Sequence, residues 1–298
     1  VDHSDFVGFT GSDVTGKKVM ARAAETLTPV SLELGGKDPM VVLEGGNMDR
    51  AVNGATWGSM LNSGQMCISV ERIYVEDGAY DEFVEKLTDS VGELKQGIDG
   101  ETAACDVGAM TMLPKLEKVE KQVDDAVEAG ARVLTGGKRG EGPGQWFEPT
   151  VLVDCTPDMS VMEDETFGPV VTVTRVSDEE EAIRLANDSR YGLCASVFGP
   201  RGRAEKVARR IEAGAVNVND IVFNMLAPGL PMGGWKESGI GYRNGEYGIR
   251  KYCRSEAIVS ARTLLRSEPL WYPYTPERHA LVSKVTKFIG GRGLRRFR

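Results

Sequence analysis

Two residues of the sequence have the type and setting for covalent catalysis, a cysteine at position 67 and a glutamate at position 33. Cys67 ends the stretch "SGQMC", in which small and flexible residues separate a helix-like segment from a strand-like one. Such a turn exposes a side chain and leaves backbone N–H groups unpaired, which can stabilise a developing oxyanion. A free thiol with a pKa of about 8.5 is only a few per cent thiolate at neutral pH, so a nucleophilic Cys67 needs a neighbouring group.

Glu33 lies in "SLELGGKDP", on a predicted strand between Leu32 and Leu34. A carboxylate held among apolar neighbours tends to have a raised pKa, which suits a general base that works near neutral pH. The alternative is a strand carboxylate that points outward from a half-buried face. The sequence around Glu33 leaves both interpretations open.

The other reactive side chains argue against several kinds of chemistry. The two histidines of the sequence, His3 and His279, lie close to its ends, so we predict neither histidine catalysis nor a histidine metal site. Cysteines 105, 155, 194 and 253 form no C-x-x-C pair, and we expect each to be a small buried apolar residue. An odd number of scattered cysteines favours a reducing compartment, and we expect a cytoplasmic protein.

Two further segments could bind a nucleotide. Gly11 and Gly16 bracket "GSDVTG" between a strand and a helix, and Ser12 lies at the helix start, where N–H groups and the helix dipole favour a phosphate. In "EDETFGPVV", Glu165 could accept hydrogen bonds from ribose hydroxyls, and Phe167 could pack on a flat heterocycle. Each segment alone is also compatible with an ordinary turn.

Strands and helices alternate along the chain, which predicts an α/β fold with helices covering mainly parallel strands. We expect strands at 30–36, 39–44, 69–77, 131–137, 191–199 and 215–220, and helices at 12–27, 48–62, 80–94, 113–130, 179–188 and 201–214. Residues 227–248 read as a long loop of the kind that often carries function.

Charge is unevenly distributed over the sequence, whose formal net charge is -8. Residues 263–298 carry a net charge of +6, so the rest of the chain is strongly acidic, and we expect no nucleic-acid partner. In the tail, one helical face is apolar, and lysines lie off it, which is consistent with a basic amphipathic helix that contacts a membrane surface through 279–298. The alternative is a helix that docks on the acidic body of its own or a neighbouring subunit.

Taken in order, the stretches "FTGSDVTG", "LELGGK", "GQMC" and "ETFGPVV" resemble the NAD(P)-dependent aldehyde dehydrogenase superfamily. The resemblance runs from residue 4 to about residue 261 and includes "PMGGWKESGIGYRNGEYGIRKY". It implies that Cys67 is the nucleophile and Glu33 the general base. It also implies that cofactor binding involves Gly11, Ser12 and Gly16 at the diphosphate, Leu34 near the nicotinamide, Glu165 on the ribose and Phe167 against the ring region.

The activity implied by this resemblance is oxidation of an aldehyde to a carboxylic acid with NAD or NADP, through a cysteine thiohemiacetal and a thioester. The implied partners are a small-molecule aldehyde and further copies of the chain in a dimer or tetramer. The stretch "CRSEAIVSA" resembles the strand that family members exchange between subunits.

The implied fold is aldehyde-dehydrogenase-like, a partial Rossmann-type cofactor domain plus a complete α/β catalytic domain. We expect a cofactor-domain remnant at 1–36, the catalytic domain at 37–235, a return segment with the oligomerisation strand at 236–262 and a basic tail at 263–298. Family members carry more of the cofactor domain before "FTGS", so we expect little activity from this chain alone. The alternative function is that of a non-catalytic binding or assembly remnant.

Overall fold

The computed structural model describes residues 1–98, 104–261, 266–268 and 271–290. The chain divides into two compact units, Val1–Cys253 and Arg254–Arg298. All residues predicted to do chemistry lie in the first unit, which contains every strand of the described chain.

The first unit follows the predicted alternation of strands and helices. Its strands are β1 (Val7–Thr10), β2 (Val30–Glu33), β3 (Asp38–Val42), β4 (Val70–Glu76), β5 (Arg132–Thr135), β6 (Thr150–Val153), β7 (Val170–Val176), β8 (Tyr191–Gly192), β9 (Cys194–Phe198), β10 (Ala215–Val218), β11 (Trp235–Lys236) and β12 (Gly239–Ile240). Its helices are α1 (Asp13–Ala24), α2 (Met48–Met60), α3 (Asp77–Gly92), α4 (Leu113–Glu128), α5 (Ser160–Glu163), α6 (Glu179–Asn187), α7 (Arg201–Ala208) and α8 (Gly245–Arg250), with short 3₁₀ turns η1 (Leu61–Gly64) and η2 (Phe223–Leu226).

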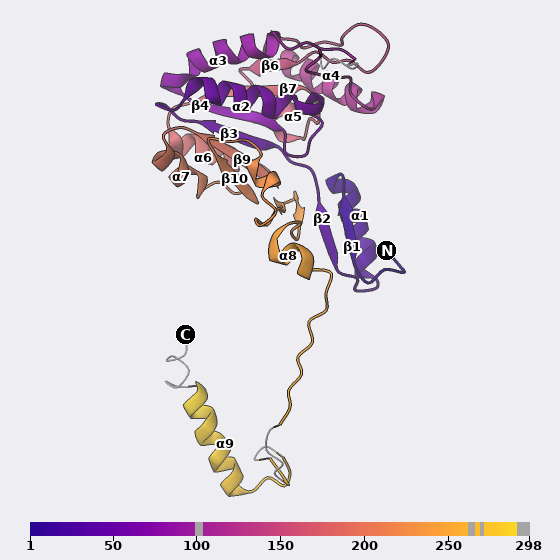
Figure 1. Ribbon diagram of the computed structural model, residues 1–298, viewed down its shortest axis with the longest axis vertical. Helices are drawn as coiled ribbons and strands as arrows, with labels where there is room; N and C mark the ends of the chain where they lie inside the picture. Colours follow the sequence, from indigo (N-terminus) through magenta and orange to yellow (C-terminus); the bar gives the residue numbers. More distant parts are fainter. Residues whose placement is uncertain (99–103, 262–265, 269–270, 291–298) are drawn as a thin grey trace. The chain divides into compact units, whose positions relative to one another are not determined.

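A seven-stranded sheet forms the centre of this unit, in the order β10-β9-β3-β4-β7-β6-β5. Neighbouring strands are parallel except β5 and β6, which are antiparallel. Figure 1 shows α2 and α3 on one face of the sheet and α6 and α7 on the other. The predicted α/β layering with mainly parallel strands is therefore confirmed.

The central strands are buried on both faces because their side chains alternate between two apolar cores. In β3, Met40 and Val42 enter the core that α2 and α3 cover, whereas Val41 enters the core beneath α6 and α7. Every residue of β3 and β4 is buried. The sheet therefore provides a rigid base for the loops at its strand ends.

A small second sheet, β1-β2-β12, holds the N-terminal segment. Strands β1 and β2 are parallel, α1 connects them, and β12 returns from late in the chain to pair with β2 in the antiparallel direction. This strand-helix-strand unit matches the elements predicted for the first 36 residues.

Two sequence expectations are corrected. Residues 227–248 are not an uninterrupted loop, because they contain β11, β12 and the start of α8. The helix expected at 201–214 ends at Ala208, and residues beyond it form a turn that leads into β10. The stretch 253–261 is not in a strand in the single chain, and its exchange between subunits stays a prediction.

The second unit contains α9 (Pro276–Phe288), so the tail does form a helix. None of its residues is buried in the single chain. Over the described ranges, no helix has both the length and the apolar character needed to cross a membrane. Nothing observed in this helix supports the membrane-surface contact that we expected for 279–298, part of which lies outside the described residues.

Candidate active site

Cys67 lies in a tight bend between η1 and β4. Asn62, Ser63 and Gly64 all adopt positive φ, at 53°, 58° and 67°. A methyl group on Gly64 would lie 2.0 Å from the carbonyl oxygen of Gly168, so only glycine allows this approach. The loop that carries the thiol is therefore packed directly against the turn that carries Phe167.

The thiol of Cys67 is half-buried, and its setting disfavours the thiolate. Burial raises the pKa of Cys67 to about 11, and Asp38 and Glu165, in their ionised forms, act in the same direction. The guanidinium of Arg243 and the backbone N–H of Cys67 lower this pKa. The resting thiol is thus protonated near neutral pH, which strengthens the expectation that it needs help to become a nucleophile.

Glu33 ends β2, where its backbone is fixed on both sides. Its carbonyl accepts a hydrogen bond from the N–H of Gly11 at 3.1 Å, and Gly239 of β12 lies opposite it. The side chain is 18% exposed and forms an ion pair with Arg243, with Nε and Oε2 3.3 Å apart. The carboxylate therefore does not lie among apolar side chains alone, because residues 223–252, the late segment, return to β2 and bring a cation.

Several predicted site residues contact the segment Glu33–Gly36, which lies at the end of β2. A methyl group on Gly16 of α1 would lie 2.5 Å from Cδ2 of Leu34, so helix and segment are in close contact. The N–H of Gly36 donates to Oε1 of Glu165 at 3.2 Å. A methyl group on Gly36 would lie 2.5 Å from the carbonyl oxygen of Cys67. Residues from positions 11 to 165 therefore meet at this segment.

The start of α1, where we predicted a phosphate site, is an exposed helix N-terminus capped by a side chain. Ser12 is the N-cap, and its Oγ accepts from the N–H of Thr15 at 3.3 Å. Gly11 and Ser12 are exposed, and Gly16 is buried against Leu34. The exposed N-terminal turn is thus available to an anion, whereas Gly16 allows the close packing that fixes the helix.

The turn with Glu165 and Phe167 is held by residues that the sequence did not single out. Glu71 of β4 accepts hydrogen bonds from the N–H groups of Thr166 and Phe167, at 2.8 and 3.0 Å. Glu71 also pairs with Lys37 at 2.5 Å, and these two side chains are 2% and 0% exposed. The ammonium of Lys37 in turn donates to Oγ1 of Thr166 at 2.9 Å.

Burial raises the pKa of Glu165, the neighbouring charge of Glu71 acts in the same direction, and the Gly36 N–H opposes both. Phe167 adopts φ of 55°, and the ammonium of Lys115 lies 5.2 Å from its ring centroid. The signal that could have found Glu71 is its charge within "SVERIYV", an apolar strand in which a carboxylate must find a partner.

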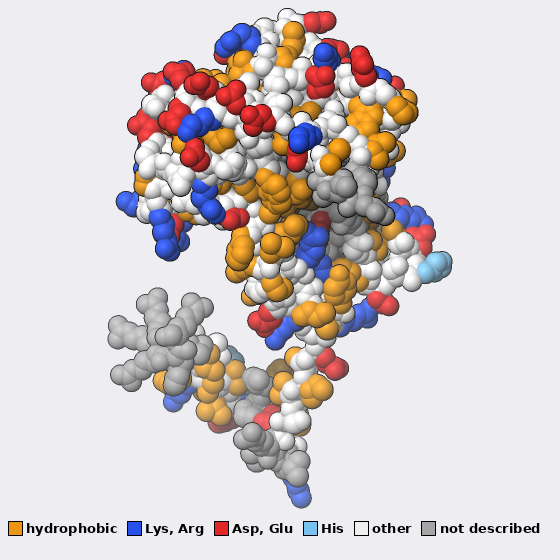
Figure 2. Space-filling view, turned by 45° about the horizontal axis from the view of Figure 1, so that its top comes forward, with side chains coloured by type: hydrophobic (Ala, Val, Ile, Leu, Met, Phe, Trp, Pro, Cys, Tyr) orange, Lys and Arg blue, Asp and Glu red, His pale blue; other side chains and the backbone are white. Residues whose placement is uncertain are grey.

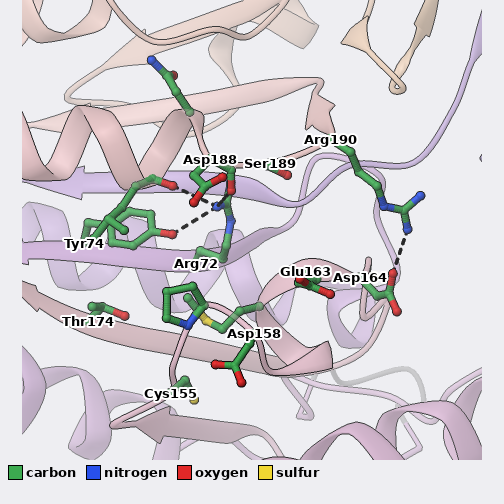
Figure 3. Close-up of a pocket in the computed structure, with 14 residues that line it drawn as sticks. Arg72, Tyr74, Cys155, Asp158, Glu163, Asp164, Thr174, Asp188, Ser189 and Arg190 are labelled. Atoms are coloured by element: carbon green, nitrogen blue, oxygen red, sulfur yellow. Dashed lines mark hydrogen bonds and ion pairs between the residues drawn. The ribbon is translucent and has the colours of Figure 1, made fainter.

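A cavity of about 580 Å³ lies elsewhere in the unit and includes neither Cys67 nor Glu33. Figure 3 shows its polar lining, in which Arg72 donates to Tyr74 and Arg190 pairs with Asp164. Arg72 also donates to the carbonyls of Leu185 and Ala186. Both cations of this cavity are therefore already engaged within the protein.

The remaining cysteines only partly follow expectation. Cys155 and Cys194 are buried as predicted, but Cys105 is half-buried and Cys253 is exposed, so the prediction is wrong for these two. All five cysteines are free. Over the part of the chain that the structure describes, no group of three or more His, Cys, Asp or Glu side chains could hold a metal ion.

Comparison with known proteins places this arrangement in a family. The model of the "Aldehyde dehydrogenase family" matches residues 1–258. The chain is 43% identical over 287 residues to "Putative succinate-semialdehyde dehydrogenase [NADP(+)] 2" of Mycobacterium ulcerans, covering 95% of this chain and 55% of that protein.

Solved structures agree with the sequence matches. A lactaldehyde dehydrogenase from Escherichia coli superposes with a TM-score of 0.82 at 38% identity, over 85% of this chain and 53% of that one. A betaine aldehyde dehydrogenase from Staphylococcus aureus in complex with NAD+ gives 0.83 at 37% identity, over 91% and 54%. The chain thus spans about half the length of the relatives it matches, and it belongs to the aldehyde dehydrogenase family.

Proposed function

We propose that the protein oxidises an aldehyde to a carboxylic acid with NAD or NADP, with Cys67 as nucleophile and Glu33 as general base. The observation that carries the proposal is the convergence at Glu33–Gly36. Contacts from Gly16, Glu165 and the Cys67 loop all reach these four residues. The Mycobacterium ulcerans relative is named for NADP(+), and the Staphylococcus aureus structure holds NAD+, which supports either nucleotide.

The residues present fit a dinucleotide. The exposed turn at Gly11 and Ser12 would hold the diphosphate, Leu34 would lie near the nicotinamide, and Glu165 would accept from ribose hydroxyls. Phe167 would pack against the ring region. When bound, the nucleotide supplies the hydride acceptor.

The chain's own residues supply the covalent steps. The Cys67 thiol releases its proton to water, and the thiolate attacks the aldehyde carbon to give a thiohemiacetal, whose oxyanion the Cys67 N–H would help to hold. After oxidation to the thioester, Glu33 accepts a proton from water so that the acyl group is released as a carboxylic acid. Cys67 then recovers its proton and is free for another cycle.

Several features of the whole protein are part of the same proposal. Exposed apolar side chains favour assembly into a dimer or tetramer. Figure 2 shows apolar side chains on the molecular surface. Those exposed in the late segment are Phe223, Met225, Leu226, Leu230, Trp235, Ile240, Tyr242, Tyr247, Ile249 and Tyr252. The five free thiols favour a cytoplasmic location. We also propose the domain division into 1–36, 37–235, 236–262 and 263–298.

The substrate is proposed as an aldehyde, and a semialdehyde with a carboxylate is one candidate on the strength of the Mycobacterium ulcerans relative's name. The test is NAD(P)H formation by the intact protein with a panel of aldehydes. Cys67→Ala should lower the rate by a factor on the order of 10⁴ or more. Cys155→Ala, which removes a buried thiol outside the Cys67 loop, is the matched control and should retain the rate of NAD(P)H formation.

Glu33→Gln separates the two halves of the reaction. The variant should form about one equivalent of NAD(P)H per active site and then stop, because the thioester is no longer hydrolysed. Retention of turnover in Cys67→Ala would refute the assignment of the nucleophile. If the intact protein forms no NAD(P)H with any aldehyde, the alternative of a non-catalytic binding or assembly remnant is favoured. This alternative is supported by the match to the Mycobacterium ulcerans relative, which covers only 55% of that protein.

A further inference from the structure

Arg190 lies between α6 and β8, and the late segment fixes its backbone. Its carbonyl accepts a hydrogen bond from the N–H of Glu237 at 2.9 Å, next to the pairing of Lys236 with Tyr191. Its guanidinium carbon lies 4.4 Å from the ring centroid of Tyr191, which is a buried side chain. The backbone and the side chain of Arg190 are therefore both held in place.

The guanidinium of Arg190 contacts carboxylates from three separate segments. Its Nη1 lies 2.8 Å from Oδ2 of Asp13, in the first turn of α1, and 3.2 Å from Oε2 of Glu237, between β11 and β12. Its Nη2 lies 2.8 Å from Oδ1 of Asp164, next to Glu165, and Figure 3 shows this ion pair. Lys17 of α1 also pairs with Glu237, at 3.0 Å. These side chains form one connected network of alternating charge that begins and ends on α1.

Apolar packing anchors α1 only weakly, so this network matters for its position. Gly16 and Ala23 are the only buried residues of the twelve-residue helix, and Val14 and Met20 are 59% and 45% exposed. A segment with few buried apolar contacts lies at the low-stability end of a fold and opens readily. The ion pairs of Arg190 therefore contribute directly to holding the start of α1.

The two carboxylates at opposite ends of the guanidinium adjoin residues that we propose to contact the nucleotide. Asp13 follows Ser12, which we propose at the diphosphate, and Asp164 precedes Glu165, which we propose at the ribose. A guanidinium is planar and donates in fixed directions, so a single arginine that holds both carboxylates also limits the distance between their segments.

We propose that Arg190 is a positioning residue for nucleotide binding, a clamp that holds the start of α1 and the turn that carries Glu165 at a fixed separation. The inference rests on the proposed function for the identity of the ligand, whereas the ion pairs of the clamp form without ligand or turnover. Because the clamp acts on the segments that bind the nucleotide and not on Cys67, its loss should weaken nucleotide binding and spare the covalent steps.

The first measurement is amide hydrogen exchange of the intact protein without nucleotide, followed by mass spectrometry. In Arg190→Met, the amides of α1 should exchange about three- to tenfold faster, because a released helix opens more often, whereas those of α3 should keep their rate. Arg184→Met is the matched control. It removes an arginine of α6 that pairs with Glu181 of the same helix at 3.3 Å, and exchange in α1 should not change.

The second measurement is the Kd of NADH and NADPH, determined by fluorescence titration, together with steady-state kinetics. Arg190→Met should raise the Kd and the KM of the nucleotide that binds by about three- to tenfold and change kcat by less than about twofold. Arg190→Lys should resemble Arg190→Met, because one ammonium replaces the fork that reaches two carboxylates.

A double variant tests whether Arg190 acts through α1. Asp13→Asn removes the α1 arm of the clamp, and it should also accelerate exchange in α1. Asp13→Asn/Arg190→Met should exchange no faster than Arg190→Met alone, because residues in direct contact do not contribute additively.

The inference is overturned if Arg190→Met leaves exchange in α1 unchanged, or if exchange in α3 rises equally, which would indicate a general folding defect. It is also overturned if Arg190→Met binds the nucleotide as tightly as the unsubstituted protein, if Arg190→Lys restores both exchange and binding, or if the effects of Asp13→Asn and Arg190→Met add. Failure of the proposed function has a different signature, namely that the unsubstituted protein binds neither nucleotide while exchange in α1 still responds to Arg190→Met. That result would remove the nucleotide from the inference and retain the clamp.

Discussion

Replacing Glu71 by glutamine tests how the turn with Glu165 and Phe167 is held. The carboxylate of Glu71 accepts from two backbone N–H groups and from the ammonium of Lys37. Both charged side chains are almost completely buried. Glutamine keeps the shape but removes the negative charge, so Lys37 becomes a buried cation without its carboxylate.

The expected loss of unfolding free energy follows from that buried charge. Removing one partner of a buried ion pair typically costs about 3–5 kcal/mol. For a domain of this size, 1 kcal/mol corresponds to about 2–4 °C in Tm, so Glu71→Gln should lower Tm by roughly 6–20 °C. The same variant should raise KM for the nucleotide more than it lowers kcat, because we propose that the turn contributes to nucleotide binding and not to the covalent steps.

Thermal unfolding followed by circular dichroism, together with steady-state kinetics on the intact protein, measures both effects. The control is Glu82→Gln, which breaks an exposed pair with Lys86 on α3 and should leave Tm unchanged. The double variant Lys37→Met/Glu71→Gln removes the unpaired cation and should recover part of the lost stability. A fall of less than about 3 °C in Glu71→Gln, or a double variant no more stable than the single one, would refute the reasoning.

Two further predictions concern single positions. Asp38 is buried, and burial raises its pKa well above the ordinary value, so folding favours its neutral form. The stability this contributes is present at low pH and is lost as pH rises above the ordinary aspartate pKa of about 4. In urea titrations, the free energy of unfolding of Asp38→Asn minus that of the unsubstituted protein should therefore increase between about pH 4 and pH 8. A difference that does not change with pH would contradict this prediction. Gly64→Ala should lower the free energy of unfolding by about 2 kcal/mol or more. Residue 64 has a positive φ, and its methyl group would also clash with the carbonyl of Gly168. Gly108→Ala, where a methyl group has open space, should change stability little, and equal losses in the two variants would count against the packing argument.

The local patterns of the sequence predicted the layers of the fold well. Apolar runs such as "PMVVLE" and the periodic segment 113–130 correspond to β3 and α4, because burial on two faces or on one stripe imposes these patterns directly. Short strands were missed in 227–248, since a two-residue strand carries no periodicity. The strand expected at 253–261 is one that pairs with another subunit, so the single chain does not test it.

The sequence by itself determined the candidate residues, because the type of side chain and its immediate neighbours are local properties. It identified a thiol on a bend at Cys67 and a carboxylate near two glycines at Glu33. It also identified the turn with Glu165, yet it could not show that these segments meet.

Only the tertiary structure decided which charges surround these residues. Arg243 reaches Glu33 through the return of β12, and Glu71 reaches the Thr166 N–H across 95 positions of the chain. The pKa of Cys67 depends on burial and on charges from three distant segments, so no local pattern could have fixed its direction. Electrostatic fields act through space, and the folded chain alone sets which residues are close in space.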